Sequence, residues 1–353
     1  MSNSYLVKNR ILWIDIVKFV GILAIVIGHT IQGGWLKHYV YSFHVPLFFF
    51  MMGVTSALTK IDSKPILQYV KKQAYSLLLP YYIFAALCTA IIFSASHFIS
   101  FDEATMFDNP STLITNILTG YCRANNPLWF LPCAFVMCMI AYFIIKFVNK
   151  IKVARLRVII YGCITIIFGI FMYANYHHFE IHRIFYKIDS ALELLPFFLI
   201  GYCFFEYGVS KKIESLNTFV KLPLAIIFIS LGAILGLTNK EAGYLNSTYG
   251  NIAVFYLSAL LSILGIIILS MLIHPFKILA YCGARTITIL VLHKFPILVF
   301  QRVIPLTSVY LQEFSIPVGI AVALISIAVC CVADIFIMRI APFMIGKRKT
   351  KKI

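Results

Sequence analysis

Four polar side chains that could do chemistry lie on one expected membrane helix, residues 12–33: Asp15, Lys18, His29 and Gln32. At about 100° per residue, all four fall on one stripe roughly 100° wide. Lys18 and His29 are then roughly 16 Å apart along the helix axis. Near neutral pH a histidine can remove a proton from an alcohol, and an ammonium group attracts phosphate. An Asp15–Lys18 pair at i,i+3 and a histidine bonded to a neighbouring helix also fit the pattern, but four aligned groups favour a functional face.

Other polar residues lie within or beside later apolar runs. A titratable side chain in hydrocarbon costs a few kcal/mol, so it normally faces a polar cavity and acts there. His44 follows His29 after a short connection, and both imidazoles are expected to reach one cavity. An interfacial capping role for His44, or a hydrogen-bonded structural role for His293, stays open. The further candidates at span starts or inside spans are Trp129, Asp189, Glu193, Asn251 and His293.

The composition shows what positions these residues. The chain has 353 residues, of which 61% are hydrophobic and 12% charged, whereas soluble domains are about half apolar and a quarter charged. Ten apolar runs are near the 20 residues that a helix needs to cross a bilayer. We expect an all-α polytopic bundle of about ten transmembrane helices, with residues 1–353 as one membrane-embedded domain. The expected spans are 12–33, 41–59, 74–98, 128–148, 156–174, 190–208, 219–237, 250–273, 279–301 and 316–343.

The formal net charge of +17 is concentrated in alternate connections between these spans. Such alternation is the positive-inside pattern, and it predicts that both termini are cytoplasmic and that the protein is multi-pass in a bacterial inner membrane. The basic tail 347–352 would contact anionic membrane lipids. Because the charge follows the connections, we expect no nucleic-acid partner. The nine cysteines include no Cys-x-x-Cys and no metal-ligand spacing, so no metal is expected.

Several blocks, taken together and in order over about residues 10–293, resemble the acyltransferase-3 superfamily of membrane O-acyltransferases. The first is Arg10-Ile11-Leu12-Trp13-Ile14-Asp15 running to Gly28-His29, and the second is Ser42-Phe43-His44-Val45-Pro46-Leu47. The later blocks are 78–82, 128–132, 189–202, 250–256 and 281–286, the last leading to His293. The chain is most similar to the fucose 4-O-acetylase-like branch, which modifies cell-surface sugars.

The resemblance implies a ten-helix enzyme that takes an acetyl group from cytoplasmic acetyl-CoA. It passes this group to a hydroxyl of a cell-surface or exported carbohydrate, such as a lipid-linked glycan acceptor. The family pairs a basic residue with a histidine eleven positions later on the first helix, and Lys18 and His29 match that pair. Lysine keeps the charge of the more frequent arginine but lacks its bidentate fork. Lys71 and Lys72 stand before the third-helix Leu-Pro and would meet the CoA phosphates.

These observations lead to a hypothesis about individual roles. His29 is the base that activates the sugar hydroxyl. Glu193 or Asp189 orients its ring, and His44 either orients it or polarises the thioester carbonyl. Lys18, Lys71 and Lys72 bind the donor. Substrate-binding roles are expected for Asp15, Trp129, Asp189, Asn251 and His293, with Trp129 stacking on a sugar face.

Two other function classes are open from the sequence. A transporter or flippase of lipid-linked sugars also uses polar spans, but it often has broken helices or paired halves, which the sequence does not suggest. A glycerolipid acyltransferase is suggested by the His-x4-Asp spacing of His97 and Asp102. With nine histidines in the chain, one such spacing arises easily by chance. Acetyl incorporation by purified membranes discriminates between transfer and transport.

Overall fold

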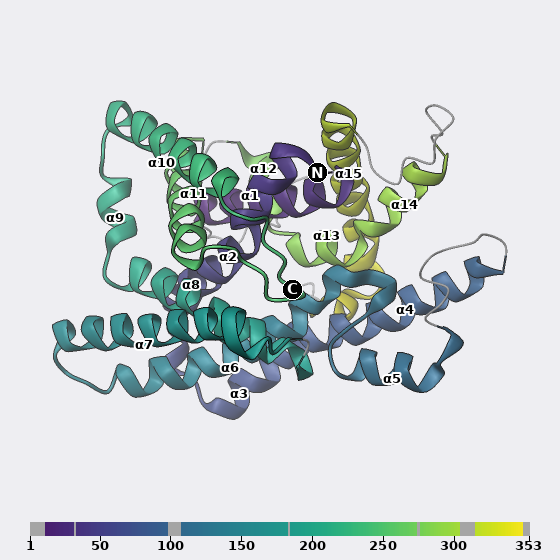
Figure 1. The fold of residues 1–353 in the computed structure, drawn as a ribbon, viewed down its shortest axis with the longest axis horizontal. Coiled ribbons are helices and arrows are strands. Elements are labelled where there is room, and N and C mark those ends of the chain that lie inside the picture. The colour runs from purple at the N-terminus through teal and green to yellow at the C-terminus, as the bar shows by residue number, and fades with distance from the viewer. Residues whose placement is uncertain are drawn as a thin grey trace.

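The protein is a helical bundle (Figure 1). The computed structural model describes residues 11–31, 33–97, 107–182, 184–273, 276–303 and 315–348; Gln32 and Asp102 fall outside these ranges. Within them the regular elements are helices, and Gly243 and Thr248 form an isolated β-bridge. The all-α prediction is confirmed. The long helices are α1 (Leu12–Thr30), α2 (Gly34–Leu58), α4 (Leu79–Ser96), α6 (Phe130–Val148), α7 (Ala154–Ala174), α8 (Ile188–Glu206), α10 (Thr218–Thr238), α11 (Ile252–Leu272) and α15 (Ile316–Ile340).

The membrane-spanning character of the bundle is confirmed as well. In the described part of the chain, nine helices are long and apolar enough to cross a membrane, and one bent pair would make a tenth. Most boundaries lie within a few residues of the predicted ones. The second helix is an exception, because α2 begins at Gly34 and not near residue 41. Hydropathy marks where hydrocarbon begins, whereas a hydrogen-bonded helix can start in the polar interface before it.

The centre of the bundle is the contact between α2 and α8. A Cβ atom on Gly53 would lie 2.0 Å from the Phe198 carbonyl oxygen, and one on Gly201 would lie 2.1 Å from that of Phe50. Only glycine therefore fits at either position, and small residues of this kind let membrane helices pack backbone to backbone. By contrast, α7 and α10 lie at the periphery (Figure 1) and expose apolar side chains. This surface is suited to lipid.

The predicted ninth span is broken, which corrects the expectation of one continuous helix over 279–301. It consists of α12 (Lys277–Gly283), α13 (Thr286–Leu292) and α14 (Lys294–Val303). The two parts of the apolar segment, 277–283 and 286–301, are bent by 60°. At the break, Arg285 Nε lies 2.9 Å from Asp334 Oδ2 on α15, and the Thr288 hydroxyl donates to Asp334 Oδ1 at 2.5 Å.

Asp334 and Arg339 lie in the same apolar run, which suggests a charge pair between them. In the structure, Asp334 pairs with Arg285 instead. Five residues along an α-helix turn about 500°, so the two side chains point to faces roughly 140° apart. Asp334 is buried, whereas Arg339 is exposed. The buried carboxylate instead fixes the break in the neighbouring span.

The shorter elements connect the spans. On the predicted inner side, η1 (Ile61–Ser63), α3 (Ile66–Gln73) and the π-helical η2 (Ala74–Leu78) lead into α4, and α9 (Val209–Glu214) follows α8. On the predicted outer side lie α5 (Pro110–Leu118), η4 (Arg123–Trp129), η5 (Asn175–Phe179) and η6 (Phe185–Lys187). The 3-10 element η7 (Pro342–Ile345) follows α15. The assignment of the two sides stays a prediction from charge.

Candidate functional site

Three histidines from three helices meet inside the bundle. The rings of His29 on α1 and His293, directly after α13, have centroids 5.3 Å apart. The His44 ring on α2 lies nearby, because Tyr41 packs against it with ring centroids 4.9 Å apart, and a Cβ atom on Gly28, the residue before His29, would lie 2.7 Å from the same Tyr41 ring. His44 and His293 are buried, and His29 is half-buried. The structure thus brings together His29, His44 and His293, three side chains that the sequence singles out separately.

The hydrogen bonds of two of these rings fix their tautomers. His44 Nδ1 lies 2.6 Å from the Val40 carbonyl oxygen. His293 Nδ1 lies 3.0 and 2.9 Å from the carbonyl oxygens of Ile289 and Leu290. Because a carbonyl can only accept, Nδ1 carries the hydrogen in both rings, and the neutral ring keeps a lone pair on Nε2. Within the described residues His293 Nε2 is buried and has no hydrogen-bond partner, so it is a vacant acceptor.

A cavity of about 270 Å³ lies between α1, α2, η2, α6 and α13, on the predicted inner side of the histidines. Its polar lining includes Lys18, Gln73, Ser76 and Thr286. The rest of the wall is mostly apolar and comes from Ile22, Ile25, Phe48, Met51, Phe130 and Leu290, among others. The cavity is therefore polar at the end that Lys18 lines and apolar along its sides.

The same helix faces that line the cavity continue to the three histidines. On α1 the face is Lys18, Ile22 and Ile25, and at about 100° per residue the next position on it is His29. On α2, Thr55, Met51 and Phe48 line the cavity, and one turn further lies His44. On α13, Thr286 and Leu290 line it, and the next position is His293. Three walls of one cavity therefore lead to one cluster of imidazoles.

The basic residues predicted to bind the donor lie around the other end of this cavity. Lys18 forms an ion pair with Asp15 at 3.7 Å, and 27% of its side chain is exposed. Asp15 itself is buried. Lys71 and Lys72 are exposed on α3, directly before the cavity-lining Gln73. The cavity thus has cationic groups at one end and imidazoles beyond the other.

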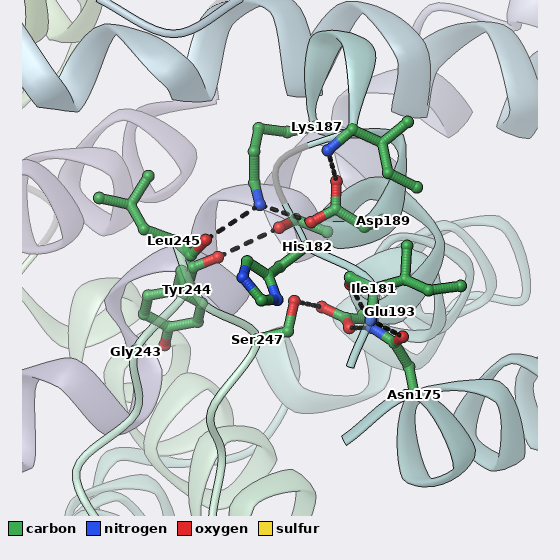
Figure 2. A network of polar contacts seen from close by, with 12 residues as sticks. Asn175, Ile181, His182, Lys187, Asp189, Glu193, Gly243, Tyr244, Leu245 and Ser247 are labelled. Carbon is green, nitrogen blue, oxygen red and sulfur yellow. Dashed lines mark hydrogen bonds and ion pairs between the residues drawn. The ribbon is translucent and has the colours of Figure 1, made fainter. Parts of the chain in front are cut away.

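The two carboxylates expected to orient His29 have other partners (Figure 2). Glu193 is fully buried and accepts hydrogen bonds from Asn175 Nδ2 (2.5 Å) and the Ser247 hydroxyl (3.0 Å), as Figure 2 shows. It also accepts from the Tyr249 hydroxyl (2.7 Å). Asp189 pairs with Lys187 Nζ at 2.5 Å. The ring that lies next to His29 is instead that of His293. Glu193 thus anchors the connection between α10 and α11, residues 239–251, which we call the α10–α11 loop. Asp189 pairs with Lys187, which itself contacts this loop.

The α10–α11 loop covers the outer side of His44. The Tyr244 ring packs edge-on against His44 with centroids 5.4 Å apart, and its hydroxyl donates to the Tyr41 carbonyl oxygen at 2.5 Å. The Ser190 hydroxyl donates to the Tyr244 carbonyl at 3.2 Å, and Lys187 Nζ donates to the Leu245 carbonyl at 3.3 Å (Figure 2). Burial raises the pKa of Tyr244 well above its usual value, so this hydroxyl remains a donor.

The family comparison agrees with this arrangement. The family model for an acyltransferase domain, Acyl_transf_3, matches residues 11–335, which is nearly the whole described bundle. The chain belongs to the acyltransferase-3 superfamily. The sequence resemblance to that superfamily is confirmed, and the protein is a multi-pass membrane acyltransferase. No significant match was found among curated proteins or among solved structures.

Two further predicted residues, Trp129 and Asn251, make structural contacts, and a role of Asn251 in substrate binding stays a prediction. Trp129 is only 7% exposed and packs edge-on against Phe130, so its indole does not form a surface for stacking. The Asn251 side chain accepts the Val254 N–H at 3.1 Å and caps α11. Within the described ranges, no group of three His, Cys, Asp or Glu side chains is placed to hold a metal ion.

The structure also reveals residues of the acyltransferase that sequence reasoning did not assign. Tyr244 and Tyr249 belong to an aromatic connection whose course no local pattern predicts. Asn125 Nδ2 donates to the Val291 carbonyl at 3.0 Å and so ties η4 to α13, next to His293. The Asn125-Asn126-Pro127 run stands out in the sequence as a polar start to a span, which is the one local signal for this contact.

Proposed function

We propose that this acyltransferase is an O-acetyltransferase that moves an acetyl group from acetyl-CoA to a hydroxyl of a cell-surface or exported carbohydrate. The observation that carries the proposal is the cavity whose α1, α2 and α13 walls all continue to histidines. Membership of the acyltransferase-3 superfamily supplies the reaction class. The carbohydrate acceptor rests on the sequence resemblance to the fucose 4-O-acetylase-like branch.

The donor would enter from the lysine end of the cavity. The pantetheine arm of CoA is long and narrow, which suits a channel with apolar walls and a few hydroxyl and amide groups such as Gln73 and Ser76. Lys18, Lys71 and Lys72 would attract the CoA phosphates as point charges. This arrangement directs the acetyl thioester towards the imidazoles.

His29 is the base in the proposed reaction. It takes the proton of the sugar hydroxyl while the oxygen attacks the thioester carbonyl carbon. The tetrahedral intermediate then loses the sulfur, the C–S bond breaks, and the thiolate takes up the proton to leave as CoA. His293 lies beside His29 and offers a vacant Nε2 acceptor to a ring N–H or a hydroxyl. The neutral His44 ring also accepts at Nε2, so it is suited to orient a donor rather than to polarise a carbonyl.

One observation favours the alternative of a transporter or flippase. The broken span at Arg285, with its bend of 60°, is a feature that transporters use at their binding sites. A lipid-linked sugar would then cross the bundle without covalent change. The two functions differ in whether acetyl is consumed.

The proposed function is tested by acetyl transfer with purified protein. The protein is reconstituted in lipid nanodiscs and incubated with radiolabelled acetyl-CoA and the envelope glycans of cells that lack its gene. We expect label to appear in the glycan as base-labile esters and free CoA to appear in equal amount. Glycan that stays unlabelled while it is translocated by the same protein in vesicles would establish the transport alternative.

The double substitution Lys71→Ala/Lys72→Ala tests the donor end of the cavity. Each exposed ion pair contributes up to about 1 kcal/mol, so loss of two raises the KM for acetyl-CoA roughly tenfold and leaves kcat nearly unchanged. The matched control is Lys211→Ala/Lys212→Ala, which removes two adjacent exposed lysines from α9, also on the predicted inner side. Equal KM values for the two double variants would remove Lys71 and Lys72 from the donor site.

A further inference from the structure

A second cleft lies at the predicted outer ends of α7, α10 and α11. It is separate from the 270 Å³ cavity proposed for acetyl-CoA, which we call the donor cavity. Its volume is about 770 Å³, within the range of about 300–1,000 Å³ that is usual for ligand sites. Its lining includes Tyr173, Tyr176, His177, Lys240 and Asn251. We call it the outer cleft. None of its lining residues takes part in the proposed transfer step.

The rings in the outer cleft form a compact group. The His177 ring centroid lies 4.5 Å from that of Tyr173 and 4.7 Å from that of Tyr176. Tyr173 is 50% exposed, so part of its ring is open to a ligand. Amphipathic aromatic rings combine a large apolar face with a polar edge. Such rings suit a sugar, which has an apolar C–H face and a rim of hydroxyl groups.

Polar groups in the same cleft can bind sugar hydroxyls. The Asn251 side-chain oxygen is used to cap α11, and no described residue accepts a hydrogen bond from its amide nitrogen. Lys240 is exposed and adds an ammonium donor. Rings together with a few amide and ammonium donors match the mixture that fixes a polar ligand in a pocket.

The α10–α11 loop connects this cleft with the histidines. Asn239, Lys240, Gly250 and Asn251 line the cleft at the two ends of the loop, and Tyr244 in its middle packs on His44. Tyr244 is four positions after Lys240, so their Cα atoms are at most about 14 Å apart. Asn239 joins the two ends of the loop, because its amide nitrogen donates to the Tyr249 and Asn251 carbonyls at 3.0 and 3.1 Å. Both ends of the loop are therefore held together at the cleft.

We propose that the outer cleft is a subsite for the acceptor oligosaccharide, which holds one part of the glycan while a hydroxyl further along reaches the histidines. This inference rests on the proposed acetyltransferase function and extends it, because it makes an oligosaccharide the preferred acceptor and free monosaccharides acceptors that bind without the cleft. Tyrosines at the membrane boundary also serve as interfacial anchors. An anchor would affect all acceptors alike, whereas a subsite discriminates by their length.

The test is the double variant Tyr173→Ala/His177→Ala with a matched control on the same turn, His178→Ala/Phe179→Ala. Both control residues are exposed, and neither lines the cleft. The acceptors are the unacetylated glycan from cells that lack the gene and the monosaccharides made from it by acid hydrolysis. We expect the cleft variant to raise the KM for the glycan at least tenfold. Its KM for the monosaccharides and for acetyl-CoA stays within twofold of the wild-type value, and the control variant behaves as wild type.

The glycan is assayed both lipid-linked and after mild-acid release from its lipid, so that the sugar and the headgroup are distinguished. An equal effect on both forms supports a site that binds sugar. An effect on the lipid-linked form alone, or a cleft variant that matches the control on every acceptor, overturns the subsite. Wild-type protein that acetylates neither form refutes the acetyltransferase function itself, which is a different outcome from either of these.

Discussion

Replacement of His29 by alanine should lower the kcat/KM for acetyl transfer by at least about 100-fold, because general-base catalysis contributes roughly 10²- to 10⁴-fold. The half-buried ring stands where the α1 face of the donor cavity continues outward, next to His293. Among the described residues, the His29 side chain has no hydrogen bond that stabilises the fold, so the His29→Ala variant should fold normally. The measurement is transfer of radiolabelled acetyl under kcat/KM conditions, with stability followed by thermal unfolding.

His97→Ala is the matched control, since this histidine is exposed directly after α4 and, among the described residues, its ring hydrogen-bonds to the Phe93 carbonyl at 2.9 Å. We expect it to retain full activity. Loss of activity in His97→Ala with retention in His29→Ala would reverse the assignment in favour of the His-x4-Asp alternative. If His293 acts through His29, the variant lacking both rings should be no slower than His29→Ala alone, because residues that act as one unit do not have additive effects.

The sequence predicts those parts of the fold that depend on hydrophobicity and helical period. Runs of apolar residues near 20 long require helices in a bilayer, because no water is present to bind free backbone groups. The same period places Lys18 and His29 on one face of α1, and that face lies along the donor cavity. These features are encoded locally, within a few turns of one helix.

Contacts between distant segments are not encoded in this way. Glu193 meets Ser247 and Tyr249 across 54 and 56 residues, so neither its helix position nor its charge indicates these partners. The expectation that Glu193 orients a histidine rested on carboxylate chemistry. In the structure this carboxylate instead accepts from the Asn175 amide of η5 and from two hydroxyls of the α10–α11 loop. Apolar composition likewise conceals the break at Arg285, because its cause is Asp334 on another helix.

The ion pair between Lys187 and Asp189 is expected to be critical for stability but replaceable as a pair. Lys187 is 3% exposed and Asp189 is 1% exposed, so each charge depends on the other for its stabilisation. Asp189→Asn leaves an ammonium group buried without its counter-ion, and the expected loss is about 3–5 kcal/mol in the free energy of unfolding. Lys187→Met/Asp189→Leu removes both charges and should recover most of that loss, since a well-packed apolar pair often replaces a buried ion pair.

The measurement is the free energy of unfolding in detergent for Asp189→Asn and for the double variant, completed by acetyl transfer at a temperature where both are folded. Lys187 also donates to the Leu245 carbonyl, which holds the α10–α11 loop over His44. The double variant should therefore be stable yet have a raised KM for the acceptor, because the loop loses one of its anchors. An Asp189→Asn variant as stable as the wild type would show that the charge of Asp189 is not what holds Lys187. A double variant with an unchanged acceptor KM would show that the other contacts of the loop position it without Lys187.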